Sequence, residues 1–63
     1  MAFIMLTIGS GKDVYYNIDR IESISQNKNN KMADVWLIDT PAPINTINTF
    51  EWVIETIKDK LEK

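Results

Sequence analysis

The sequence predicts an α+β fold, a four- to five-stranded antiparallel β-sheet in meander order with one C-terminal amphipathic helix. Short segments with apolar residues at every second position occupy most of the chain, and turn-forming residues separate them. From Phe50 onward the apolar residues instead recur every three or four positions, which is the period of a helix with one buried side. With 63 residues, we expect one small domain spanning residues 1–63.

The first two predicted strands form a hairpin. Phe3–Ile8 reads FIMLTI and Asp13–Ile18 reads DVYYNI, and both alternate between two faces. The Gly-Ser-Gly-Lys segment between them holds two glycines, which supply the positive φ angles of a hairpin turn. The residues expected on the helix-facing side of the hairpin are Ile4, Leu6, Ile8, Val14, Tyr16 and Ile18.

The middle of the chain predicts two further strands. Asp19–Ile21 reads as a short turn that the Asp19 side chain caps, and Glu22–Gln26 as a short third strand. Asn27–Lys31 has no apolar residue to bury, which indicates an exposed loop. Met32–Ile38 is the fourth strand, and it places Val35 and Leu37 on the helix-facing side.

Two prolines, Pro41 and Pro43, end the fourth strand because proline cannot donate to a central ladder. Ile44–Ile47 then predicts a short edge strand, and the C-terminal helix follows it. Asn48 is the expected N-cap, with Glu51 three residues later, and Thr49 is the competing cap. The core stripe of the helix is Phe50, Val53, Ile54, Ile57 and Leu61. Basic residues favour the C-terminal end of the helix dipole at positions Lys58, Lys60 and Lys63.

The second face of the predicted sheet is unusually apolar. A single helix covers one face of a small antiparallel sheet, and the other face is normally polar. Here the other face holds Phe3, Met5, Tyr15, Trp36 and Ile38. Trp52 lies about 200° around the helix from Phe50, which puts it off the core stripe.

Two interpretations explain these aromatic side chains. Either Trp36 and Trp52 fold into one crowded core, or they mark a surface that contacts another protein chain. We favour the second, because a chain this short is marginal alone and tryptophan is enriched at interface hot spots. The candidate interface residues are therefore Trp36, Trp52, Phe3, Met5 and Tyr15.

The composition disfavours an enzyme. The chain has no His and no Cys, so it lacks the commonest general base, a thiol nucleophile and the ligands of a zinc site. The Gly-Lys turn lacks the spacing of a phosphate-binding loop, and the aspartates do not form a calcium loop. We therefore expect no catalytic, cofactor-binding or metal residues and no cofactor.

The charge disfavours nucleic acid as a partner. Nine acidic residues against seven basic ones give a net charge of −2, and a nucleic-acid binder needs a concentrated basic surface. The alternative kept open is a small nucleic-acid-binding module in which Tyr15 stacks on bases beside Lys12, Arg20, Lys28 and Lys31. No apolar run approaches the roughly 20 residues of a membrane span, and the N-terminus lacks signal-peptide features. We expect a cytoplasmic location without membrane insertion.

The opening of the chain resembles a known family. A strand, a Gly-Lys turn and the run VYYNIDRIESI resemble the opening of the flagellar FlbD and swarming-motility SwrD family, and small proteins of bacteria and their phages built on that plan. The matching positions are Leu6, Thr7, Gly11, Lys12, Val14, Tyr16, Asn17, Ile21, Glu22 and Ile24. The helix over Phe50–Ile57 is similar to the family's closing helix, whereas the TPAPINTIN segment and the two tryptophans depart from its pattern. The resemblance implies an accessory protein without catalytic activity, and it transfers no catalytic or ligand residue.

Taken together, these patterns predict a small non-enzymatic adaptor or regulatory protein. It would act through protein–protein contact and self-association, with a homo-oligomer as the expected state and a different protein as a further candidate partner.

Overall fold

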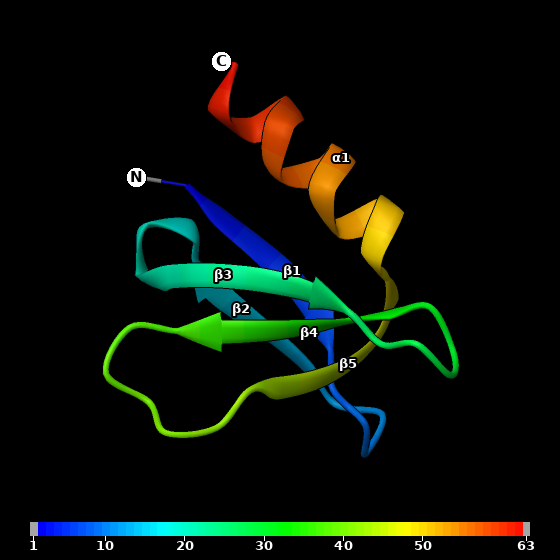
Figure 1. Ribbon diagram of the computed structural model, residues 1–63. Coiled ribbons are helices and arrows are strands. Elements are labelled where there is room, and N and C mark those ends of the chain that lie inside the picture. The colour runs from blue at the N-terminus through cyan, green and yellow to red at the C-terminus, as the bar shows by residue number, and fades with distance from the viewer. Residues whose placement is uncertain (1, 63) are drawn as a thin grey trace.

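The structure confirms an α+β fold with five antiparallel strands and one C-terminal helix (Figure 1). It is a computed structural model that describes residues 2–62. Lys63, expected in the last helical turn, lies outside the described residues. The elements are β1 (Phe3–Thr7), β2 (Asp13–Asn17), a 3₁₀ turn (Ile18–Arg20), β3 (Ile21–Gln26), β4 (Met32–Leu37), β5 (Ile44–Thr49) and α1 (Phe50–Leu61).

The five strands are divided between two sheets. β1 pairs with β2, and β3, β4 and β5 form a three-stranded meander. The sheets meet where Ile8 forms a bridge with Thr46 and the Gly9 amide donates to the Asn45 carbonyl at 3.1 Å. β5 is the terminal strand of the three-stranded sheet, as predicted for Ile44–Ile47, and on its other side it meets the end of β1 through this bridge.

The core lies between the two sheets and the helix. Its fully buried members come from β1, β4 and α1, which means that the sheets share one core and that α1 closes it. The buried apolar residues are Ile4, Leu6, Ile18, Ala33, Val35 and Val53. Four of them were predicted to face the helix, while Tyr16 and Leu37 pack against the cluster as partly buried residues. Burying one large aliphatic side chain contributes about 1.5–3 kcal/mol.

The hairpin turn has the geometry that its sequence predicts, whereas the 3₁₀ turn has a different capping residue from the predicted one. Gly11 has a φ of 90°, in the left-handed region where glycine is favoured, as the hairpin turn requires. Asp39 adopts a φ of 67° after β4. At the 3₁₀ turn the prediction that Asp19 caps is wrong. The Asn17 side chain accepts instead from the Asp19 amide at 2.9 Å, because an asparagine oxygen reaches the amide two residues ahead.

The helix begins after the competing cap, Thr49. Its hydroxyl accepts from the Trp52 amide at 3.2 Å, which satisfies one of the free donors of the first turn. The first-choice cap, Asn48, is the wrong prediction. Its side-chain oxygen accepts from the Thr7 amide at 2.8 Å, and it thereby ties β1 to the residues that precede the helix.

Candidate protein interface

Three of the candidate interface residues lie together on the outward face of the β1–β2 hairpin. Ile4 and Leu6 are fully buried, so strand alternation turns their neighbours Phe3 and Met5 outward. Met5 lies directly opposite Tyr15 in the strand register. Exposure is 46% for Phe3, 42% for Met5 and 70% for Tyr15. We call this surface of Phe3, Met5 and Tyr15 the hairpin patch.

Polar residues border the hairpin patch at both ends. Asn17 lies opposite Phe3 in the register, and Asp13 lies opposite Thr7. The Thr7 hydroxyl donates to an Asp13 carboxylate oxygen at 2.8 Å. An apolar centre with a polar rim is the arrangement that stable protein contacts use.

Ile47 is an exposed residue near this surface that was not among the candidates. Thr46 is buried, so alternation along β5 turns Ile47 outward, and it is 53% exposed. The bridge between Ile8 and Thr46 brings it alongside Thr7, at one end of the hairpin patch. The alternation of apolar and polar residues in the INTINT segment could have identified Ile47 as an outward residue. Strand alternation does not indicate that β5 meets β1, so it could not place Ile47 near the hairpin patch.

The two tryptophans do not join the hairpin patch through strand pairing. Trp36 is half-buried on the outward face of β4, opposite Ser23 and on the other sheet. Trp52 is exposed on α1, about 160° around the helix from Ile54. Neither belongs to the core cluster or to the residues packed against it within positions 2–62. Trp36 and Trp52 therefore remain candidate interface residues on surfaces separate from the hairpin patch.

The basic residues of the nucleic-acid alternative are dispersed. Lys12 lies in the β1–β2 turn, Arg20 in the 3₁₀ turn, and Lys28 and Lys31 in the β3–β4 loop. In Figure 1 the 3₁₀ turn lies on the left of the molecule, and the β1–β2 turn and the β3–β4 loop lie on the right. Tyr15 is exposed, as that alternative requires, but the four basic residues of the alternative lie in three separate connections within residues 2–62.

Neither a metal cluster nor a membrane helix is found in the described part of the chain. Within residues 2–62 there is no group of three or more His, Cys, Asp or Glu side chains that could hold a metal ion. The helix found in the same range is too short and too polar to cross a membrane.

Comparisons of the chain with protein-family models, curated proteins and solved structures gave no match. The resemblance to the FlbD and SwrD family therefore stays a prediction, and the functional argument depends on the chain's own surfaces.

Proposed function

We propose that the chain is a small non-enzymatic adaptor or regulatory protein that acts through protein–protein contact and associates with copies of itself. The observation that carries the proposal is the hairpin patch, where Phe3, Met5 and Tyr15 are exposed side by side on one sheet face. A cytoplasmic accessory role, as the family resemblance implies, agrees with such a surface.

Self-association is favoured by size and by the chemistry of the patch. A chain of about 60 residues buries only about 60% of the surface that its unfolded form exposes, so further burial between copies stabilises it. Tyrosine is enriched among the residues that contribute most to binding, and Tyr15 is the most exposed member of the hairpin patch. Two hairpin patches related by a two-fold axis would cover each other.

The test is the mass in solution, measured by light scattering over a dilution series. We expect a wild-type mass above that of one chain. Met5→Lys should lower it to the monomer mass, because a buried lysine without a partner costs several kcal/mol in an interface. The helical circular dichroism should stay unchanged, because Met5 faces away from the core.

Leu61→Lys is the matched control. It introduces the same charge at another exposed apolar position, on α1, and should leave the mass unchanged. Trp36→Ala and Trp52→Ala, measured in the same series, show whether the contact reaches either tryptophan. A wild-type protein that is monomeric at every concentration would contradict self-association.

A further inference from the structure

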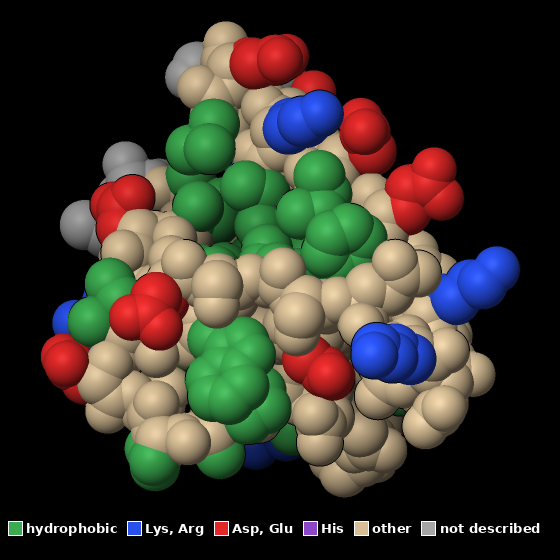
Figure 2. Space-filling view, viewed as in Figure 1, with side chains coloured by type: hydrophobic (Ala, Val, Ile, Leu, Met, Phe, Trp, Pro, Cys, Tyr) green, Lys and Arg blue, Asp and Glu red, His purple; other side chains and the backbone are tan. Residues whose placement is uncertain are grey.

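An apolar groove runs between α1 and β3. Two adjoining hollows, of about 410 and 460 Å³, lie along it, and both are lined by Ile54. Figure 2 shows apolar side chains gathered at the surface between the helix and the strand. The groove is lined by Phe50, Ile54, Ile57 and Leu61 from α1 and by Ile21 and Ile24 from β3.

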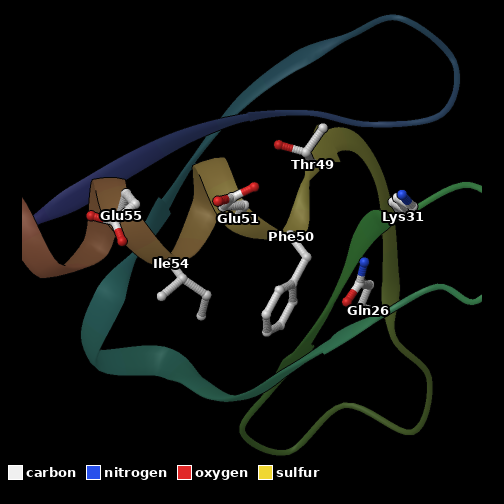
Figure 3. A pocket seen from close by; sticks show the side chains of 7 residues that line it. All are labelled: Gln26, Lys31, Thr49, Phe50, Glu51, Ile54 and Glu55. Atoms are coloured by element: carbon white, nitrogen blue, oxygen red, sulfur yellow. The ribbon is translucent and has the colours of Figure 1, made fainter.

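The groove exists because the helix stripe is only partly covered. All five stripe residues were expected in the core, but Val53 alone is fully buried. Leu61 is 63% exposed, and Ile54 lines both hollows. Figure 3 shows the Phe50 and Ile54 side chains projecting from α1 into the hollow that they line. The apolar stripe is therefore available for a further contact.

The other wall of the groove is the free side of a strand. β3 is the terminal strand of its sheet, with β4 as its only strand neighbour in residues 2–62. Four consecutive residues, Ile21–Ile24, line one hollow. Successive side chains point to opposite faces of a strand, so a hollow lined by all four borders the strand's edge.

The two walls match in length. Six residues of β3 extend over about 20 Å, and twelve residues of α1 over about 18 Å. An extended segment of about six residues would follow the free side of β3, with α1 crossing obliquely beside it (Figure 1). Adding a strand to a sheet edge is an established mode of peptide recognition, in which main-chain hydrogen bonds give affinity and pockets for alternate side chains give specificity.

Charge identifies the kind of segment that fits. Four exposed carboxylates line the two hollows, Asp19 and Glu22 in one and Glu51 and Glu55 in the other. Lys31 is the one basic side chain among the lining residues. The groove is therefore apolar along its floor and acidic at its rim, which favours an apolar segment flanked by basic residues and disfavours phosphate.

We propose that this groove binds an extended segment of a partner protein, which adds as a strand to the free side of β3. Its alternate side chains are apolar and enter the groove beside Ile54 and Ile57, and Lys or Arg residues on its flanks meet the carboxylate rim. The inference rests on the proposed function only in treating the chain as a protein-contact module, because it uses a different surface from the hairpin patch.

The test selects peptides from a display library of random nine-residue sequences on the full chain. We expect enriched sequences with alternating apolar residues and flanking Lys or Arg. The most enriched one, synthesised and labelled, should bind less tightly as salt is raised, since rim charges are screened. Glu22→Lys and Leu61→Lys should each weaken it about tenfold, the first by charge reversal and the second by lost apolar contact. Amide hydrogen exchange in β3 should slow on binding.

Two controls separate this inference from the proposed function. Asp13→Lys makes the same charge change at the hairpin, and Met5→Lys alters the hairpin patch, so neither should change peptide affinity. A library without enrichment, enriched peptides without basic flanks, or affinity that Glu22→Lys leaves intact would overturn the inference. None of these results would change the mass of the wild-type chain, which tests self-association on its own.

Discussion

The two sheets share a core but differ in their outward faces. The β1–β2 hairpin presents Phe3, Met5 and Tyr15, of which Tyr15 is the most exposed. Outward on the three-stranded sheet, Ser25, Asp34 and Asn45 lie side by side in one row across β3, β4 and β5. The next row pairs Ser23 with the half-buried Trp36.

This difference indicates which outward face is suited to exposure to solvent and which to contact with another protein. Burying one face of a sheet places no demand on its other face, so polar residues are the ordinary outcome there. The three-stranded sheet follows that rule in the row of Ser25, Asp34 and Asn45. It departs from the rule at the separate positions Trp36 and Ile47, whereas the hairpin departs from it at three neighbouring residues. An apolar outward face on the smaller sheet is therefore the stronger sign of a contact surface.

The largest expected effect on stability is the difference between a variant on the inward face of the hairpin and one on its outward face. Leu6→Ala should lower the free energy of unfolding by about 2–5 kcal/mol, because Leu6 is fully buried and its truncation leaves a cavity. Met5→Ala, one residue away and facing outward, should change it by less than about 1 kcal/mol in dilute protein. Urea unfolding followed by circular dichroism measures both. Equal losses would mean that the hairpin patch is part of the folding core.

A smaller effect is expected where the sheets meet. The buried Thr46 hydroxyl donates to the Ala33 carbonyl at 2.8 Å, next to the bridge with Ile8. Thr46→Val should cost about 1–3 kcal/mol, because the donor is lost where water cannot replace it. Thr40→Val is the control, since Thr40 makes the same kind of bond to Leu37 at 2.9 Å in an exposed turn. Thermal unfolding measures both variants. A similar loss of unfolding free energy in both would contradict a larger contribution from the buried hydrogen bond where the sheets meet.

The smallest effect concerns the hairpin turn. Gly11→Ala should destabilise the protein by about 1–2 kcal/mol, because a φ of 90° is unfavourable for alanine. Gly9 has no such angle, and a Cβ there would lie 3.9 Å from the Asn45 carbonyl oxygen, an ordinary contact. Gly9→Ala should therefore fall within about 0.5 kcal/mol of the wild type. Matching melting temperatures for the two variants would contradict the assigned turn geometry.

The sequence predicted the strands, the helix and much of the core because each depends on local periodicity. Ile4, Leu6 and Val35 were placed on the correct faces by alternation alone. Phe3, Met5 and Tyr15 were grouped for the same reason, and the structure places them together.

The remaining features depend on contacts between distant residues. Asn48 was a reasonable cap by local rules, but it bonds the Thr7 amide, 41 positions away. Alternation also assigns a residue to a face without saying which sheet the strand joins, so Trp36 was grouped with the hairpin residues. Register shifts in β3 and β4 and the 3₁₀ turn after β2 accompany the division into two sheets. The open groove was missed because the helix stripe was assumed to be fully covered.

The separation of the hairpin patch from the groove determines how copies of the chain can assemble. Contact of one hairpin patch with another is complete after two molecules, because each uses the same surface. Insertion of a hairpin patch into a neighbour's groove would leave a free surface at each end and would extend the assembly into a ring or a filament. The carboxylates around the groove oppose a second copy, because the chain carries a net charge of −2. If the chain associates with copies of itself as proposed, the acidic rim would favour a closed dimer of hairpin patches over head-to-tail assembly through the groove.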